Sequence, residues 1–253
     1  MIMLIATWNV NSLNARMEHL KEFLKSVDII ALQETKVEDD KFPEKIFNDM
    51  GFNCVYKGEK GYNGVAILSK FEIDSVERDF DWIERGQKRI LMVEIKGIKL
   101  LNAYFPHGKN IGSPYYEYKI EFIEKLADYL KDFMDDRLII MGDFNVAMEN
   151  KDAYAPDILQ YSIGFSERER KALKKLYEIG FVDIFRMFNN EAKQYTWWDY
   201  RANSFKRNAG MRIDYIWATN KIAKNFKNCF IEKEMRAKPK PSDHTPVVAE
   251  IEI

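Results

Sequence analysis

The sequence predicts an α/β fold in which two stacked β-sheets are covered by helices. Two observations lead to this prediction. Many short strand-like runs are concentrated in two stretches of the chain, and helical patterns are interspersed among them. In addition, no internal repeat, low-complexity tract or long linker divides the 253 residues. We therefore expect a single domain over residues 1–253.

The first stretch begins with apolar runs at residues 3–8 and 28–32 that stop abruptly at polar residues, as buried strands do when they lead into loops. Apolar residues at helical spacing predict a helix over 14–25, and a second helix over 43–50 would end at Gly51. Strand-like runs follow at 53–56, 64–68, 73–77, 90–95 and 99–104. Their glycine- and charge-rich connections predict antiparallel hairpins.

The second stretch alternates helices and strands. An amphipathic pattern predicts a helix over 116–133, and residues 137–141 form the next buried strand. Ser166 and Glu169 form a capping-box pattern, and Gly180 follows the last apolar position, so both ends of a helix over 166–179 are marked. Strands are expected at 211–218 and 247–253.

Composition excludes several classes of protein. The chain has 46% hydrophobic and 31% charged residues, which is typical of a globular protein rather than a disordered one. Its 39 Lys and Arg against 40 Asp and Glu do not by themselves indicate a polyanionic partner. Two cysteines are too few for a disulfide framework, and no apolar run is long enough to suggest a membrane span. The apolar start lacks a basic lead, so we expect no secretory signal and a cytoplasmic location.

Polar side chains stand at the ends of five predicted strands. In sheets of mixed direction the carboxyl ends of some strands and the amino ends of others share one rim, so these groups are expected to meet in one cleft. Asn9 and Asn11, two residues apart in extended chain, would point the same way. The polar groups in question are Asn9, Asn11, Gln33, Glu34, Asp143, Asn145, Asp214, Asp243 and His244.

A cleft of carboxylates and amides without a cysteine cluster suits a hard divalent cation such as Mg²⁺. Together with an imidazole it suits hydrolysis of a phosphoric ester, in which charge on the phosphoryl oxygens is neutralised and a water is deprotonated. The sequence contains no Gly-x-Ser-x-Gly motif and no phosphate loop of the Walker type.

The ordered motifs of the chain resemble exonuclease III and the related AP endonucleases of the endonuclease/exonuclease/phosphatase superfamily. The tryptophan pair and the Gly-Asp-Phe-Asn-Val-Ala block belong to the DNA-repair branch, whereas Gln-Glu and Ser-Asp-His occur across the superfamily. The matching blocks are residues 8–11 (WNVN), 32–36 (LQETK), 102–106 (NAYFP), 142–147 (GDFNVA), 195–201 (YTWWDYR), 212–215 (RIDY) and 242–244 (SDH).

The resemblance implies a fold and an activity. The fold would be a four-layer α-β-β-α sandwich of two mixed sheets flanked by helices, as in DNase I. The activity would be Mg²⁺- or Mn²⁺-dependent hydrolysis of the phosphodiester 5′ to an abasic site, with 3′-5′ exonuclease and 3′-phosphodiesterase activities as additions. The partner would be double-stranded DNA with abasic sites or 3′ ends, bound by a monomer.

The resemblance also implies roles for single residues. Glu34 would be the main metal ligand, with Asp243 and Asn11 nearby. His244 would act at the scissile phosphate, paired with Asp214 rather than with Asp243, because adjacent side chains in extended chain point apart. The choice between His244 and Asp143 as the general base stays open. The remaining catalytic roles fall to Asp143, Asn145 and Asn9, which would orient the water, and to Tyr104, which would donate to a phosphate oxygen.

Substrate contacts follow from the same resemblance. Trp197, Met211 and Ile213 would form an apolar pocket for the flipped abasic sugar, while Trp198 is expected to be a core aromatic. Cations at Arg201, Lys206, Arg207 and Arg212 are dense enough to contact flanking phosphates.

The chain departs from the family pattern in two places. His107 stands in a DNA-contacting loop that often carries Gln or Asn, and its charge would make binding sensitive to pH. Residues 148–155 also differ, which leaves the DNA contacts of that loop undefined.

Two rival functions differ in what they require of the chain. A phosphatase for a small lipid or inositol phosphate would not depend on Trp197. A non-catalytic DNA-binding module would have lost its acidic and histidine positions. All five are present in this chain: Glu34, Asp143, Asp214, Asp243 and His244.

Overall fold

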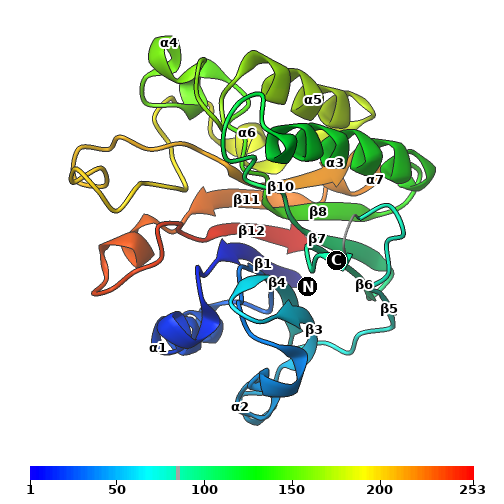
Figure 1. Ribbon diagram of the computed structural model, residues 1–253. Helices are drawn as coiled ribbons and strands as arrows, with labels where there is room; N and C mark the ends of the chain where they lie inside the picture. Colours follow the sequence, from blue (N-terminus) through cyan, green and yellow to red (C-terminus); the bar gives the residue numbers. More distant parts are fainter. Residues whose placement is uncertain (84–85) are drawn as a thin grey trace.

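The computed structural model describes residues 1–83 and 86–253, and within these ranges the strands form two six-stranded sheets (Figure 1). In spatial order the first sheet consists of β11 (Phe226–Ile231), β12 (Val247–Glu252), β1 (Ile2–Asn9), β2 (Ile29–Gln33), β4 (Tyr62–Ser69) and β3 (Asn53–Glu59). The second consists of β5 (Ser75–Glu77), β6 (Ile90–Ile95), β7 (Ile98–Tyr104), β8 (Leu138–Asp143), β10 (Asp214–Thr219) and β9 (Phe181–Asp183).

Both sheets are mixed, which confirms the predicted architecture. The β1–β2 and β7–β8 pairs are parallel, and the neighbouring pairs β1–β12 and β8–β10 are antiparallel. The inner faces of the two sheets pack on each other through a core that includes Ile5, Ile67, Leu100 and Ile216. Burial of this apolar surface is the main favourable contribution to folding.

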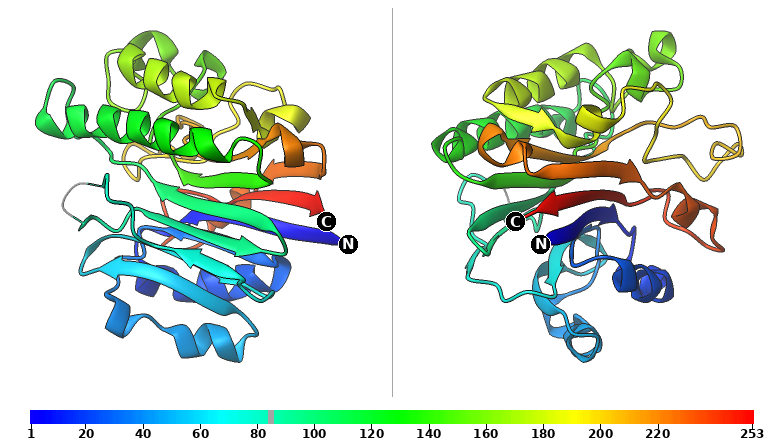
Figure 2. Two further views of the ribbon diagram at one scale, coloured as in Figure 1. Left: turned by 90° about the vertical axis from the view of Figure 1, so that its right-hand side faces the viewer. Right: turned by 180° about the vertical axis from the view of Figure 1, so that it is seen from behind.

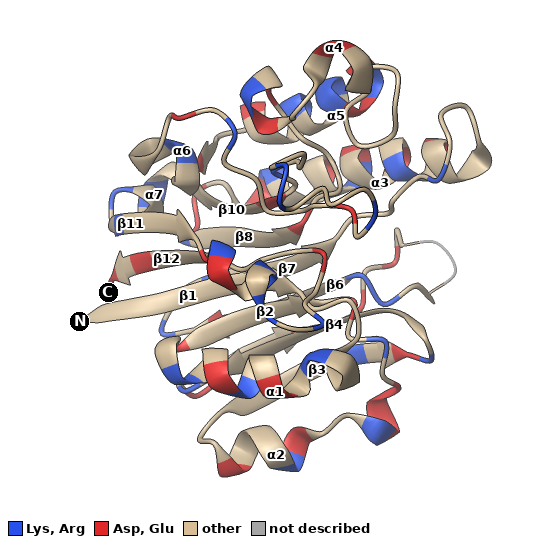
Figure 3. Ribbon diagram, turned by 90° about the vertical axis from the view of Figure 1, so that its left-hand side faces the viewer, with Lys and Arg blue, Asp and Glu red and all other residues tan. Residues whose placement is uncertain are grey.

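Helices cover the two outer faces, giving the four layers seen in Figure 2. On the first sheet, α1 (Leu13–Phe23) and α2 (Glu44–Asp49) pack through buried residues such as Leu20 and Phe47. On the second, α3 (Pro114–Leu130) and α5 (Glu167–Glu178) pack through residues such as Ile123 and Leu173. The short helices are α4 (Pro156–Leu159), α6 (Ile184–Phe188) and α7 (Asn220–Ala223). Charged positions gather mainly on the helices and loops (Figure 3).

The helix ends that carry a capping or glycine signal in the sequence were predicted correctly. The Ser166 side chain accepts a hydrogen bond from the Glu169 amide, and the Glu169 side chain accepts one from the Ser166 amide, which is the predicted capping box. Gly51 follows α2 with φ 84°, the left-handed conformation expected after a helix. The predicted helices over 14–25 and 116–133 each end in a 3₁₀ turn, at Leu24–Ser26 and Lys131–Phe133.

One predicted hairpin is wrong. β3 with β4 and β6 with β7 are antiparallel neighbours as expected, but β4 and β5 lie in different sheets. The chain crosses from one sheet to the other between them, and the local turn signals carry no information about that change. The short elements α4, α7 and β9 also had no sequence signal, because three or four residues are too few to establish a period.

The two chain ends lie side by side, where the Met1 amino group donates to the Ile253 carbonyl over 3.1 Å (Figures 1 and 2). Among the described residues, no helix has both the length and the apolar character needed to cross a membrane.

Candidate active site

The predicted polar strand ends meet at one rim, on both sheets. Asn9 and Gln33 are register partners at the ends of parallel β1 and β2. On the second sheet Asp143, at the end of β8, is the partner of Tyr104 on one side and of Asp214 on the other. The mixed strand directions therefore gather these groups, as the sequence predicted.

Gly142 allows the close pairing that places Asp143. Its φ is 150°, and a Cβ at this position would lie 1.9 Å from the backbone oxygen of Ala103 on β7. A side chain there would push β8 away from β7 and shift the following carboxylate.

Asn9 links the two sheets at the centre of the rim. Its Nδ2 lies 2.9 Å from Glu34 Oε1 and 2.9 Å from Asp143 Oδ2, so one amide donates to carboxylates from both sheets. Gln33 was expected to face the same cleft. Instead it is fully buried, and its Nε2 donates to Asn102 Oδ1 over 2.8 Å, so it joins the sheets from inside.

His244 lies between two carboxylates. Its Nδ1 is 2.9 Å from Asp214 Oδ2, which confirms the predicted pairing with Asp214, and its Nε2 is 3.7 Å from Asp143 Oδ2. Ser242 explains the rest of the motif, because its hydroxyl donates to the Asn9 carbonyl over 2.7 Å and accepts from the His244 amide. The imidazole is thus held to both sheets and is only 4% exposed.

The two acidic neighbours determine the charge of this imidazole. Burial alone lowers the pKa of His244, but the carboxylates of Asp214 and Asp143 outweigh it and raise the pKa to about 10. Burial raises the pKa of the Asp143 carboxyl to about 7, against the opposing charge of His244. At neutral pH the imidazole is therefore a proton donor.

Tyr104 borders the same group of acids. Burial raises the pKa of its hydroxyl well above the ordinary range, and the nearby carboxylates of Glu34 and Asp143 add to the effect. The hydroxyl consequently keeps its proton and is available as a donor.

Two sets of side chains at the rim have the character of a cation site. Glu34, Asp143 and His244 each present a ligand atom, and these atoms lie within 4.8 Å of one another. Beside them the Lys36 ammonium bridges Glu34 Oε2, 2.9 Å away, and Asn11 Oδ1, 2.6 Å away. No role was predicted for Lys36, although it directly follows the Gln33-Glu34-Thr35 block.

Asn11 is not in extended chain, which the prediction for the two asparagines had assumed. β1 ends at Asn9, and Asn11 has a left-handed backbone, with φ 44°. Its Nδ2 donates to Asp243 Oδ1 over 2.9 Å, so Asn11 connects Asp243 to Lys36 and, through it, to Glu34.

An apolar cluster adjoins the acids. Met211 and Ile213 pack with Phe165, and Trp197 is packed against them, half-buried. Trp197 also forms backbone bridges with Met211 and with His244, which places the cluster directly beside the imidazole. The three residues predicted to share a pocket are thus in contact. Phe165 was not predicted, because it lies far away in sequence.

Gly210 makes the pairing of Trp197 with Met211 possible. A Cβ on Gly210 would lie 2.5 Å from the Trp197 carbonyl oxygen and 2.6 Å from the Trp198 ring. Trp198 itself is fully buried, as expected of a core aromatic.

Arg212 does not contact flanking phosphates, which corrects the prediction. Its side chain is 1% exposed, and its guanidinium forms ion pairs with Asp152 and Asp183, each at 2.8 Å. Arg201 is exposed and pairs with Asp199 over 2.8 Å. Sequence density alone could not distinguish these two arginines, because only the fold decides which one points inward.

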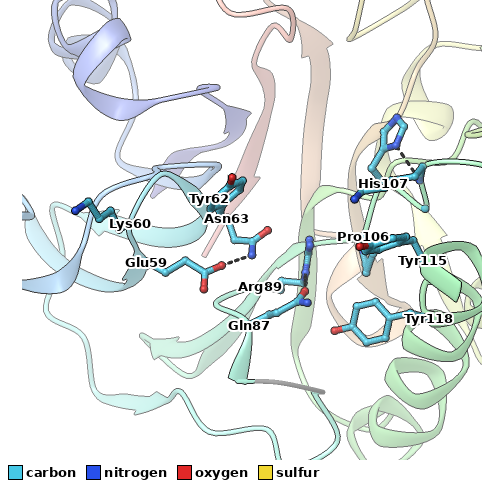
Figure 4. A pocket seen from close by; sticks show the side chains of 12 residues that line it. Glu59, Lys60, Tyr62, Asn63, Gln87, Arg89, Pro106, His107, Tyr115 and Tyr118 are labelled. Carbon is cyan, nitrogen blue, oxygen red and sulfur yellow. Dashed lines mark hydrogen bonds between the residues drawn. The ribbon is translucent and has the colours of Figure 1, made fainter.

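His107 lines a groove of about 510 Å³ (Figure 4). Figure 4 shows Tyr62 from the start of β4 on one side, His107 and Tyr115 on the other, and Arg89 between them. The Arg89 guanidinium carbon lies 4.8 Å from the centre of the Tyr104 ring, so this groove is in contact with the acidic site.

The charge of His107 differs from the expectation. Loss of hydration, together with the ammonium of Lys119, lowers the pKa of this histidine. Its Nδ1 accepts from the Lys109 amide over 3.2 Å, as a neutral imidazole does. The predicted sensitivity to pH is therefore shifted to more acidic solution.

Comparison with known proteins agrees with this geometry. The model of the endonuclease/exonuclease/phosphatase family matches residues 6–244. Exodeoxyribonuclease III of Haemophilus influenzae is 34% identical over 261 residues, with 96% of this chain and 98% of the relative covered.

Solved structures are similar over nearly the whole chain. An AP endonuclease from Archaeoglobus fulgidus superposes with a TM-score of 0.96 at 39% identity, covering 99% of this chain and 100% of that one. A 3′ phosphatase from Neisseria bound to a product DNA hairpin gives 0.96 at 36% identity, with the same coverage. The protein therefore belongs to the endonuclease/exonuclease/phosphatase family, as a hydrolytic nuclease of the group formed by exodeoxyribonuclease III and the AP endonucleases.

Proposed function

We propose that this protein is a Mg²⁺-dependent DNA repair nuclease that hydrolyses the phosphodiester 5′ to an abasic site. We include 3′-5′ exonuclease and 3′-phosphodiesterase activity on DNA ends. The observation that carries the proposal is the contact between the acidic group around His244 and the apolar cluster of Trp197, Met211 and Ile213. Relatives named as an AP endonuclease and a 3′ phosphatase support it.

The donor set fits a divalent cation. The Lys36 ammonium lies where a cation meets both the Glu34 carboxylate and the Asn11 carbonyl oxygen, and carboxylate and amide oxygens are the ligands that Mg²⁺ prefers. We assign Glu34 as the main ligand, with Asn11 and Asp243 on the same side; Mn²⁺ would be accepted by the same donors. When bound, the ion would withdraw charge from the phosphoryl oxygens and stabilise the leaving oxyanion.

His244 and Asp143 have separate roles in proton transfer. His244, held by Asp214 through Nδ1, directs Nε2 toward the cleft and donates to a phosphoryl or leaving oxygen. Asp143 is the better candidate for the base that orients and deprotonates the water. Its carboxylate is itself positioned by the Asn145 amide at 2.8 Å and by Asn9 at 2.9 Å.

Tyr104 completes the polar side of the site. Its protonated hydroxyl, beside Glu34, is suited to donate to a phosphate oxygen. Because this donor is fixed before substrate binds, little reorganisation is needed at the moment of reaction.

The apolar cluster provides the selection of abasic sites. Met211 and Ile213 are 8% and 4% exposed, so the wall they form with Trp197 is close-packed and offers no hydrogen-bond partner to a base. A sugar without a base would fit against it, whereas a normal nucleotide would not.

Double-stranded DNA would approach along the groove and the exposed arginine loop. Lys60, Arg89, His107 and Lys109 line the groove and would contact phosphates, and Arg201, with the neighbouring exposed Lys206 and Arg207, would do so on the other flank. We further propose that residues 1–253 act as one domain, as a monomer in the cytoplasm.

The test is incubation of the purified protein with a duplex carrying one abasic site, in Mg²⁺, in Mn²⁺ and in EDTA. We expect a cut 5′ to the abasic site that leaves a 3′ hydroxyl, only in the presence of metal, and no cut in the same duplex without the abasic site. A duplex with a 3′-phosphate end measures the second activity. Cleavage in EDTA, or no cleavage of either substrate, would refute the proposal.

A further inference from the structure

A buried ion pair lies beneath the proposed active site. Lys119 on α3 and Glu169 on α5 are both fully buried, and Lys119 Nζ lies 2.5 Å from Glu169 Oε1. Residues of either type are rarely found in this environment.

Every polar atom of this pair has a partner. Besides Glu169, the ammonium donates to the carbonyl oxygens of Asn145, 2.7 Å away, and His107, 3.2 Å away. Glu169 in turn accepts from the amides of Gly164 and Ser166, both at 3.0 Å, and from the Ser166 hydroxyl. The three donors of the ammonium are thus used on three acceptors that come from three separate segments.

Stability alone does not account for such a pair. Removing two charges from water costs several kcal/mol per ion, and well-packed apolar residues in their place are often as stable or more so. What the pair provides is a fixed position for the groups that it holds. Both carbonyls belong to residues at the proposed reaction site or in the adjoining groove.

The contact to Asn145 is the decisive one. Asn145 has a left-handed backbone, with φ 52°, which is uncommon for a residue with a side chain. In this conformation its amide donates to Asp143 Oδ1 over 2.8 Å, and its Nδ2 donates both to Asp143 Oδ2 over 3.2 Å and to the Phe105 carbonyl over 2.9 Å. Its own carbonyl accepts from the Lys119 ammonium. The ammonium therefore holds the peptide whose orientation aims Asn145 at Asp143.

Glu169 holds the same loop from a second point. The Gly164 amide donates to Glu169, and the Gly164 carbonyl accepts from the Ala147 amide over 2.8 Å. Of the residues that follow Asp143, Asn145 is thus bonded to Lys119. Ala147 is bonded to Gly164, which Glu169 holds in place.

We propose that Lys119 and Glu169 are positioning residues, which set the orientation of Asn145 toward Asp143 and couple the His107 groove to the reaction site. The inference rests on the proposed function, because it takes Asp143 and Asn145 as parts of the catalytic machinery. Neither Lys119 nor Glu169 touches substrate. Their effect passes through the two carbonyls that the ammonium holds.

The test is a double variant, Lys119→Met with Glu169→Gln, which removes both charges at similar volume. A misplacement of about 1 Å costs about 10²-fold in rate, so we expect a loss of kcat approaching that size on the abasic duplex, with a smaller change in KM. The matched control is Lys175→Met with Glu124→Gln, because that pair joins the same two helices over 2.8 Å at the surface. The control is expected to keep the parent kcat.

A structural and a positioning role are distinguished in the Asn145→Ala background. If the pair acts by aiming Asn145, the double variant loses little further kcat once that side chain is gone. If the ion pair only supports the fold, the double variant loses the same factor in kcat in both backgrounds, and the inference is overturned. The Asn145 side-chain amide signal in an NMR spectrum, assigned by its loss in Asn145→Ala, should shift in the double variant and not in the control.

Other outcomes are equally informative. If the double variant does not fold, Glu169→Gln alone is compared in the two backgrounds, where equal factors again overturn the inference. A parent protein that is inactive on abasic DNA refutes the proposed function instead, and the NMR comparison still decides whether the pair sets Asn145. An unchanged Asn145 signal in a folded variant contradicts the inference whatever the activity is.

Discussion

The indole nitrogen of Trp197 donates to Asp243 Oδ2 over 3.1 Å, which joins the wall of the apolar cluster to the acidic side of the site. Asp243 uses its other oxygen on Asn11. Recognition of an abasic sugar and binding of a metal would therefore share one carboxylate. Changes to the ring are expected to affect the two functions to different degrees.

Substitution of Trp197 should separate recognition of the abasic sugar from binding of the metal. Trp197→Ala removes the apolar wall and should lower kcat/KM for abasic cleavage by about 10–200-fold, the range for one apolar contact, while 3′-phosphate removal falls less. Trp197→Phe keeps the wall but loses the hydrogen bond, so its abasic selectivity should be nearly that of the parent. Equal losses on both substrates would contradict the pocket assignment, and no loss on either would favour a small-molecule phosphatase.

The Asp214–His244 contact is expected to matter for rate and not for binding. Asp214→Asn leaves the volume unchanged but removes the carboxylate that orients the imidazole and stabilises its charge. We expect kcat to fall by about 10²–10⁴-fold with DNA affinity within a factor of two or so of the parent. Single-turnover kinetics measure the first and fluorescence anisotropy the second. Asp128→Asn, an exposed acid on α3, is the control and should behave as the parent does.

Lys36 is expected to compete with the metal. Its ammonium lies against Glu34 and Asn11, so Lys36→Met should lower the half-saturating Mg²⁺ concentration by about five-fold, which corresponds to ~1 kcal/mol between neighbouring charges in water. Calorimetric titration with Mn²⁺ in the absence of DNA provides an independent measure. Lys41→Met, at an exposed pair with Glu38, should leave both values unchanged. Weaker metal binding in Lys36→Met would show that the ammonium supports the site instead.

Binding of DNA should respond to pH through His107 only in acidic solution. The pKa of this histidine is lowered from its ordinary value of about 6.5 by desolvation and by Lys119, with Glu169 and Glu34 opposing. Affinity should therefore stay flat from pH 8 to about 6.5 and rise below that, as the imidazole gains a charge facing phosphate. His107→Gln should remove the rise. An equal rise in His107→Gln would assign it to another group.

His107 should also make the stability of the fold fall in acidic solution. The folded state favours the neutral imidazole of His107. The contribution of His107 to the unfolding free energy is therefore fully present above about pH 6.5 and is lost as the pH falls through the lowered pKa of the folded state. Compared with His107→Gln, the parent should lose more unfolding free energy between pH 6.5 and 5. Urea denaturation at a series of pH values provides the measurement.

Substitution of Arg212 should lower the stability of the fold, whereas substitution of Arg201 should weaken the salt dependence of DNA binding. Arg212→Met leaves the Asp183 carboxylate without its ion-pair partner and Asp152 with Arg186 alone, which should cost about 3–5 kcal/mol in urea denaturation without changing the salt dependence of DNA binding. Arg201→Ala should leave the stability unchanged and reduce the slope of log affinity against log salt by about one. A salt slope altered by Arg212→Met at unchanged stability would contradict its assignment to the interior.

The sequence by itself determined the layers of the fold and the chemistry of the site. Apolar runs that stop at Asn9, Gln33 and Asp143 identify buried strands and the polar rim, because carboxylates and amides at the end of a buried strand need other polar groups as hydrogen-bond partners. The ordered motifs led to the same family that the comparisons show. These features are local, so a linear chain carries them.

Only the tertiary structure decided which side chains meet. Gln33 turned inward to Asn102 and Arg212 turned inward to Asp152, although neighbouring residues with similar propensities face the cleft or solvent. The pairing of Lys119 with Glu169 depends on how α3 and α5 cross the second sheet, and no spacing in the sequence encodes it. Contacts between segments 50 or more residues apart are set by packing of the whole core, and so they are absent from any local pattern.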